Sequence, residues 1–250
     1  MNVAPGAWRY AIWPLVAAPF ALLISLPAAA VLLAGLGGFV LWFFRDPDRT
    51  PPASGIVAPA DGKVSVLRTE GETVRVGIFM NVWNVHVIRS PADGRVVDVE
   101  HTPGAHRPAF SKESDRNERV HVRFSGSSTD GSTANPPTDA SLLDPEQTDA
   151  RVSAPIEEVT LIAGAFARRI TPYVDTAERV HRGDRIGHIA FGSRVDVVFG
   201  PDVSIDDVAV DPGEKTRSGE TQLLEPEAID ANLPLIDEET VPTENVEEDG

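Results

Sequence analysis

The sequence predicts a mainly β domain, organised as a sandwich or barrel, that follows an N-terminal helical hairpin. Two observations carry this prediction. Residues 10–44 contain no charged side chain, and the chain beyond Pro52 consists of short apolar runs separated by glycine-containing turns. A third observation limits the chemistry, because the chain has no cysteine and therefore has no disulfides, thiol nucleophile or cysteine metal ligands.

The uncharged N-terminal stretch is too long for one simple membrane span, which needs roughly 20 apolar residues. Ser25-Leu26-Pro27 predicts a break between two shorter helices. We therefore expect residues 1–46 to form a helical hairpin that enters or crosses a membrane. A cleaved signal peptide is the alternative, but the apolar region is too long for one and only Arg9 precedes it.

Arginines flank both ends of this stretch, with Arg9 before it and Arg45 and Arg49 after it. Basic residues are enriched on the cytoplasmic side of membrane segments. We therefore expect the cell membrane as the location, with the following domain on its cytoplasmic face.

The predicted β domain spans residues 47–222. Its short apolar runs alternate with turns such as Ala60-Asp61-Gly62 and Ala92-Asp93-Gly94. Regularly spaced short strands of this kind are typical of sandwiches and barrels. The runs expected to be strands are 56–58, 63–67, 73–79, 84–88, 95–99, 120–124, 159–163, 168–170, 185–191, 195–199 and 208–210.

The net charge of −16 is confined to two segments. Residues 126–150 carry five acids and residues 218–250 carry eleven, both without a base, and together they account for the whole excess. Few apolar groups occur in either, which predicts a disordered acidic insertion at 125–150 and a disordered acidic tail at 223–250. The balanced remainder indicates no nucleic-acid partner. The many acidic residues, together with only three Lys against 19 Arg, give a composition that resembles that of proteins from extreme halophiles.

Three residues are candidates for chemistry. Ser193 follows Gly192 between two strand-like runs, Asp61 lies in a tight turn, and His86 lies in an apolar run. Taken singly, each favours a structural interpretation as a turn or core residue. The histidines have no zinc-ligand spacing, and no dinucleotide fingerprint or phosphate loop occurs, so no metal or nucleotide is expected.

Six motifs taken together point further. They are Phe43-Phe44-Arg45-Asp46-Pro47, Pro59-Ala60-Asp61-Gly62, Phe79-Met80-Asn81-Val82-Trp83-Asn84-Val85-His86-Val87, Asn117-Glu118-Arg119, Ala167-Arg168-Arg169-Ile170 and Phe191-Gly192-Ser193-Arg194-Val195-Asp196. In this order they resemble the short-form phosphatidylserine decarboxylases, most of all the archaeal branch acting on archaetidylserine. The resemblance covers roughly residues 9–124 and 151–222.

The resemblance implies a self-processing enzyme with a covalent pyruvoyl cofactor made from Ser193. Its hydroxyl would attack the Gly192 carbonyl, and the chain would be cut into residues 1–192 and 193–250, which would stay associated. A serine hydroxyl needs a base to become a good nucleophile. His86, oriented by Asp61, would complete a serine–histidine–aspartate set.

The implied reaction converts a serine phospholipid to the ethanolamine phospholipid and CO₂, with the pyruvoyl group as electron sink and His86 as proton donor. Arg89, Arg119, Arg168 and Arg169 are candidates for binding the substrate's phosphate, with surface ion pairs as their alternative role. The sequence does not distinguish between ester-linked acyl tails and ether-linked isoprenoid tails on the substrate. A homo-oligomer is also compatible with it.

One departure from the family pattern concerns the base. Longer family members carry a second histidine where Arg89 stands, so either His86 would serve both maturation and turnover or a different group would help. Residues 178–189 resemble the hammerhead turns of lipoyl and biotinyl domains, which makes a membrane-anchored scaffold module the alternative function. No lysine lies near this hairpin, however, and a zinc peptidase of the lysostaphin kind would need a His-x-His pair.

Overall fold

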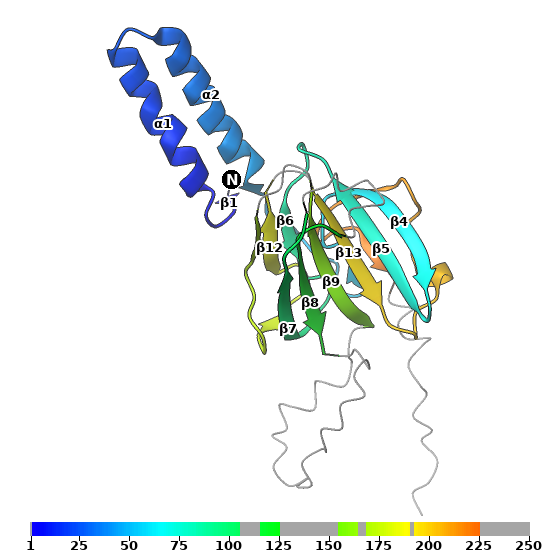
Figure 1. Ribbon diagram of the computed structural model, residues 1–250. Coiled ribbons are helices and arrows are strands. Elements are labelled where there is room, and N and C mark those ends of the chain that lie inside the picture. Colours follow the sequence, from blue (N-terminus) through cyan, green and yellow to red (C-terminus); the bar gives the residue numbers. More distant parts are fainter. Residues whose placement is uncertain (1, 106–115, 126–154, 165–168, 191–192, 226–250) are drawn as a thin grey trace, which may run out of the picture.

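The computed structural model describes residues 2–105, 116–125, 155–164, 169–190 and 193–225. It shows two N-terminal helices that project from a mainly β domain (Figure 1). The predicted fold class is confirmed at this level: the domain is built of strands, and a helical hairpin precedes it.

Helix α1 (Trp8–Leu23) and helix α2 (Pro27–Phe43) form the hairpin. The chain reverses at Ser25, whose φ of 61° lies in the left-handed region, and Pro27 opens α2 where its missing N–H is not needed. Strand β1 (Asn2–Val3) pairs with β2 (Arg45–Asp46), so both ends of the hairpin meet at the β domain. Neither described helix has both the length and the apolar character that crossing a membrane requires.

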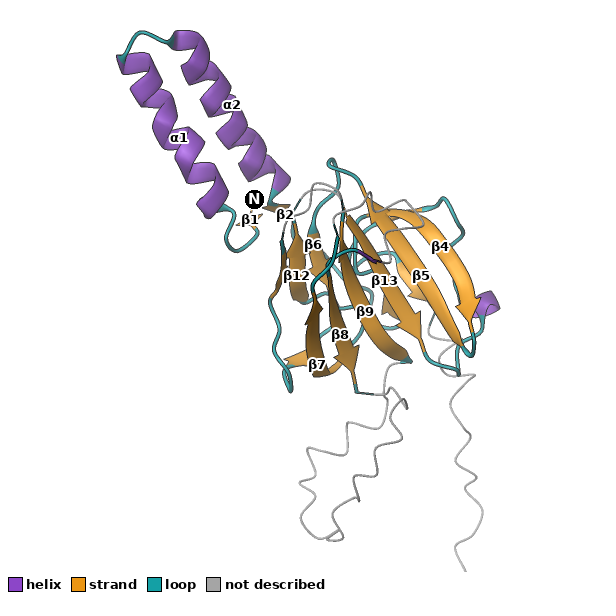
Figure 2. Cartoon of the chain, viewed as in Figure 1, coloured by secondary structure: helices purple, strands orange, loops and turns teal. Residues whose placement is uncertain are grey.

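The named strands of the described domain all pair in antiparallel fashion (Figure 2). The largest sheet contains, in spatial order, β11 (Arg179–Val180), β7 (Gly94–Thr102), β8 (Arg119–Phe124), β9 (Ile156–Ala163), β13 (Ser193–Phe199), β5 (Thr73–Met80), β4 (Gly62–Glu70) and β14 (Lys215–Thr216). A second sheet contains β10 (Ile170–Pro172), β12 (Arg185–Ile189) and β6 (Val87–Arg89). Strand β15 (Gln222–Leu224) pairs with β3 (Ile56–Val57), and η4 (Ile205–Asp207) is a short 3₁₀ helix.

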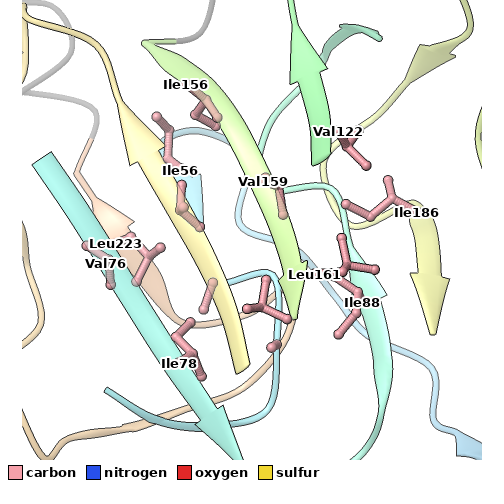
Figure 3. Packing of buried hydrophobic residues seen from close by; sticks show 14 of the residues in the cluster. Ile56, Val76, Ile78, Ile88, Val122, Ile156, Val159, Leu161, Ile186 and Leu223 are labelled. Carbon is pink, nitrogen blue, oxygen red and sulfur yellow. The ribbon is translucent and has the colours of Figure 1, made fainter. Parts of the chain in front are cut away.

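The core lies on the inner side of the large sheet (Figure 3). Strand β13 is buried along its whole length, and Val195, Val197 and Phe199 belong to the core cluster. Because side chains alternate along a strand, Arg194 and Asp196 lie on the opposite face. There Asp196 accepts hydrogen bonds from Arg194, at 2.7 Å, and from Arg75 at 3.3 Å.

The structure differs from the sequence prediction around His86. The run 84–88 was predicted as a strand, but β6 begins only at Val87. Two asparagine side chains hold a turn instead: Asn81 Oδ1 accepts the N–H of Trp83 and Asn84 Oδ1 accepts the N–H of Asn81. His86 therefore lies in a loop and not in a strand.

The C-terminal end of the described fold also differs from the expected boundary at 222. Leu223 and Leu224 are in β15 and fully buried in the core. The predicted acidic insertion, apart from Ser125, and the predicted acidic tail beyond residue 225 lie outside the described residues.

Candidate functional site

Ser193 opens the central strand of the large sheet. Its register partners are Met80 at the end of β5 and Ala163 at the end of β9. It is fully buried, and strand alternation puts it in the same inward row as Val195. Within the described part of the chain its Oγ has no hydrogen-bond partner. A buried unpaired hydroxyl costs on the order of 1–3 kcal/mol, so this one calls for a functional explanation. Gly192 lies outside the described residues.

Asn117 fixes the sheet beside Ser193. Its side-chain amide donates a 2.7 Å hydrogen bond to the carbonyl of Ala163, and the N–H of Ala163 donates to the carbonyl of Glu118. Asn117 is only 1% exposed. Asn117 belongs to the motif Asn117-Glu118-Arg119 but was not among the site residues predicted from the sequence.

His86 is buried and held in one orientation. Its Nδ1 lies 3.0 Å from the main-chain oxygen of Asn84. We infer that Nδ1 carries the proton, which leaves Nε2 as the acceptor. Burial lowers the pKa of His86 to about 4, and the nearby charge of Arg45 acts in the same direction. The imidazole is therefore neutral at physiological pH and can act as a base.

Ser193 and His86 come to the same end of the sheet. Strand β5 ends at Met80, opposite Ser193, and the chain then leads through the asparagine turn to His86. A small apolar cluster joins Val85 and Val87, on either side of His86, to Ala190 and to Phe43 at the end of α2. The hairpin projects from this end of the β domain (Figure 1).

Asp61 has different partners from those predicted. Both of its carboxylate oxygens lie 2.8 Å from Nη2 of Arg49, and its Oδ1 accepts the N–H of Ser218. Arg49 is nearly buried and also reaches Glu220 at 3.4 Å. The orienting contact that the structure shows for Nδ1 of His86 comes from Asn84.

The four arginines predicted to contact the substrate's phosphate lie in different environments. Arg89 is buried and donates to Asp46, at 2.7 Å, and to the Gly183 carbonyl at 2.8 Å, which makes it a structural residue. Arg119 lines a cavity of about 180 Å³ beside Arg194 and Asp196, on the face of the sheet away from the core. Arg168 lies outside the described residues. Arg169 is exposed and lines a cavity of about 690 Å³.

A row of rings connects the hairpin with two histidines. The Phe43 ring lies 4.4 Å from the imidazole of His86 and 5.2 Å from the ring of Phe44. Phe44 in turn meets His188 edge-on at 5.6 Å. His188 Nδ1 is 2.6 Å from the hydroxyl of Tyr173, and burial lowers the pKa of His188 to about 4.

This row of rings was not predicted from the sequence. Phe43 and Phe44 belong to the motif Phe43-Phe44-Arg45-Asp46-Pro47, and that motif was the available signal. No sequence signal predicted the contact between His188 and Tyr173, because this contact depends on the pairing of β12 with β10.

Comparison with known proteins gives a consistent result. The family model described as phosphatidylserine decarboxylase matches residues 36–224. A putative archaetidylserine decarboxylase proenzyme of Halobacterium salinarum is 50% identical over 220 residues, covering 88% of this chain and 96% of that protein. A phosphatidylserine decarboxylase proenzyme of Streptomyces avermitilis is 42% identical over 197 residues, 78% of each chain. A putative archaetidylserine decarboxylase proenzyme of Methanopyrus kandleri is 34% identical, covering 89% of this chain and 98% of that protein.

Proposed function

We propose, from the premise that the chain belongs to the phosphatidylserine decarboxylase family, that Ser193 is the residue from which its pyruvoyl group is made. The chain is a self-processing, pyruvoyl-dependent decarboxylase of serine phospholipids, made as a proenzyme.

The observation that carries the assignment is the buried, unpartnered hydroxyl of Ser193. In the proposed step Oγ attacks the carbonyl carbon of Gly192 and the peptide C–N bond breaks, which gives an ester and a free amine. Elimination of the ester releases the Gly192 carboxylate and leaves dehydroalanine, and addition of water then yields the pyruvoyl group and ammonia. Apolar surroundings leave the hydroxyl without competing hydrogen bonds, which suits this attack.

His86 is the proposed base for this attack. Its imidazole is neutral, and its Nδ1 is turned towards Asn84, so that Nε2 is the atom that accepts the proton from Oγ. In turnover the pyruvoyl group supplies the electron sink, and Nε2 of His86 is the proposed carrier of the proton that replaces CO₂ on the substrate carbon. One histidine then serves both reactions.

Asp61 acts, in our proposal, through Arg49. The Asp61–Arg49 pair ties the segment that leaves the hairpin to the turn after β3. Arg49 follows Phe43 by six residues, so this pair helps to hold the Phe43 ring against His86. Asp61 is thus a positioning residue, and a direct contact between Asp61 and His86 stays a prediction.

The helical hairpin is the proposed membrane contact. Its outward surface is apolar and exposed, which is the property of a surface that meets lipid. The most exposed large side chains are Trp13, Phe20, Leu22, Leu23, Ile24, Val31 and Leu32, at 61–79% exposure. We place the hairpin in the cell membrane, with the β domain on the cytoplasmic face. The two family branches leave the tail chemistry open between ester and ether.

The two fragments of the processed chain are proposed to stay together. Strand β13 lies between β5 and β9, and each of its seven residues has a register partner in both neighbours. β14 and β15 also pair with strands of the larger fragment. Every described strand after the cleavage position is therefore held by strands that precede it.

Intact-mass and denaturing-gel analysis of the purified protein tests the assignment. We expect two chains of residues 1–192 and 193–250, the smaller one blocked at its N-terminus, and one particle by native size exclusion. Ser193→Ala should stay uncut, whereas the control Ser65→Ala, whose hydroxyl bonds to the Gly77 carbonyl, should be cut normally. A Ser193→Ala chain that is still cut would overturn the assignment. Decarboxylation assays with ester-linked and ether-linked serine lipids then define the tail preference.

A further inference from the structure

A cavity of about 690 Å³ lies where the hairpin meets the β domain. Its walls come from four places: the chain around the start of α1, the strands β7 and β8, the segment that enters β10, and β12. The lining residues that matter for its charge are Arg9, Arg169, His101, Glu118 and His188. Because α1 begins here and continues outward with exposed apolar side chains, the cavity opens at the level at which a lipid head group would meet the protein.

The charge of this cavity is unbalanced and positive. Arg9 and Arg169 are both exposed, and within the described residues neither guanidinium forms a hydrogen bond or an ion pair. The carboxylate of Glu118 is already bonded to Nε2 of His101 at 3.0 Å. His188 is neutral at physiological pH because burial lowers its pKa to about 4. Two exposed arginines thus line one hollow whose single carboxylate already has a hydrogen-bond partner.

The cavity is joined to the reactive residues by the backbone and by packed rings. The carbonyl of Arg169 accepts the N–H of Ala190, three residues before Ser193. His188, in the cavity wall, is the end of the row of rings that leads through Phe44 and Phe43 to His86. The backbone of Arg169 is thus paired with the segment that leads to the reactive serine.

We propose that Arg9 and Arg169 together bind the phosphodiester of the serine phospholipid. This inference rests on the proposed function. In the substrate one methylene carbon separates the phosphate oxygen from the carbon that loses CO₂, so the phosphate must be held close to the reacting group. A phosphodiester offers two anionic oxygens, and guanidinium groups bind such oxygens with paired, charge-assisted hydrogen bonds. Arg9 would then make the chain that precedes the hairpin part of the substrate site.

The first test is kinetic and uses the processed, full-length enzyme. Arg9→Gln and Arg169→Gln should be cut normally on a denaturing gel, yet each should raise KM for a serine phospholipid by about tenfold or more, with a smaller change in kcat. The matched control is Arg179→Gln, an exposed arginine of β11 that does not line the cavity, and its KM should stay at the wild-type value. Failure of the proposed function would appear as an uncut or inactive wild type, which is distinguishable from unchanged KM values in active variants.

The second test measures binding without turnover or a bilayer. The uncut Ser193→Ala chain is titrated calorimetrically with glycerophosphoethanolamine, which is the water-soluble head group of the product, with ethanolamine and with inorganic phosphate. We expect glycerophosphoethanolamine to bind more tightly than either other compound, and we expect Arg9→Gln and Arg169→Gln each to remove that advantage. If the uncut chain binds none of them, competitive inhibition of the processed wild type by the same compounds replaces the titration.

Two results would overturn the proposal. In the first, Arg9→Gln weakens binding to anionic vesicles but leaves the affinity for glycerophosphoethanolamine unchanged, which would make Arg9 a general membrane contact. In the second, inorganic phosphate binds as tightly as glycerophosphoethanolamine, which would make the cavity a site for free phosphate. A loss specific to the soluble phosphodiester in both arginine variants supports the head-group site.

Discussion

The aromatic ring of Phe43 lies 4.4 Å from the imidazole of His86, with the two planes tilted by 32°. Phe43 is the last residue of α2, and it is completely buried. The hairpin that we place in the membrane therefore ends as one wall of the site that carries the proposed base. Removing water from His86 is the main cause of its low pKa, and Phe43 contributes to that removal.

Replacing Phe43 should change the pH dependence of self-processing. In the wild type the rate should be constant above pH 6 and fall to half near pH 4, because only the neutral form of His86 accepts a proton. Phe43→Leu admits water to the imidazole, which should move the half-point upward towards the ordinary value of 6.5. The measurement is the rate of chain cleavage on refolding the proenzyme from denaturant, followed on gels from pH 4 to 8.

The matched control is Phe39→Leu, one turn earlier on α2. Phe39 is 38% exposed, and its ring touches Phe43 and Trp42. We expect its half-point to stay near pH 4. Equal half-points in the Phe43 and wild-type proteins would show that Phe43 does not control the protonation of His86.

The stability of the uncut protein should fall as the pH decreases from 6.5 towards 4. His86 and His188 both have their pKa lowered by burial to about 4, so in this interval the unfolded chain binds more protons than the folded one. Their contribution is complete above pH 6.5 and is lost below it, by up to about 3 kcal/mol for each histidine at pH 4.

His188→Gln in the Ser193→Ala background isolates one of these two contributions. The slope of the free energy of unfolding against pH, from urea titrations between pH 4 and 6.5, should then be smaller than that of the Ser193→Ala parent by one histidine's share, about 1 kcal/mol per pH unit. All other titrating groups are shared by the two proteins, so their effects cancel. An unchanged slope would argue against a neutral, buried His188.

The Asp46 carboxylate should be a large contributor to stability. It is 2% exposed, and it accepts hydrogen bonds from the buried Arg89 and from Arg185. Asp46→Asn removes the counter-charge of a buried guanidinium, which should cost about 3 kcal/mol or more. Asp93→Asn is the control, because this exposed carboxylate pairs with Arg182 at the surface and its loss should cost less than about 1 kcal/mol. Urea denaturation of the uncut chains gives both values.

Asp61 and Arg49 should behave as one unit in processing. If Asp61 acts through Arg49, Asp61→Asn, Arg49→Gln and the double variant should slow chain cleavage by similar factors, because each breaks the same 2.8 Å ion pair. A cleavage rate that falls strongly in Asp61→Asn but not in Arg49→Gln would instead favour direct orientation of His86 by Asp61.

The parts of the fold that the sequence predicted correctly are those with local signals. The uncharged stretch with its central break gave the helical hairpin, and alternating apolar runs gave most of the strands of the large sheet. The loop at residues 81–86 was missed because side-chain hydrogen bonds of Asn81 and Asn84 overrode an apolar pattern. The run 208–210 was predicted as a strand. In the structure it forms only an isolated bridge with β15, from Val208 to Leu224.

The candidate site was less predictable than the fold. Ser193 and His86 were predicted from motifs, and the structure brings them to one end of the sheet. The partners of Asp61, the contact between Tyr173 and His188, and the cavity beside Arg9 all depend on residues that are distant in sequence. No periodicity encodes such contacts, since they follow from how the strands pair and from where the hairpin meets the domain.

The position of β13 at the centre of the large sheet also affects whether the mature enzyme can refold after it has unfolded. Before the cut, folding is a unimolecular process, and β13 reaches β5 and β9 on the same chain. After the cut, an unfolded molecule becomes two separate polypeptides, whose reassembly depends on their concentration. Refolding yields should then differ between the uncut and the mature protein. We expect the intact precursor to give the higher yield, because its folding does not depend on two fragments meeting again.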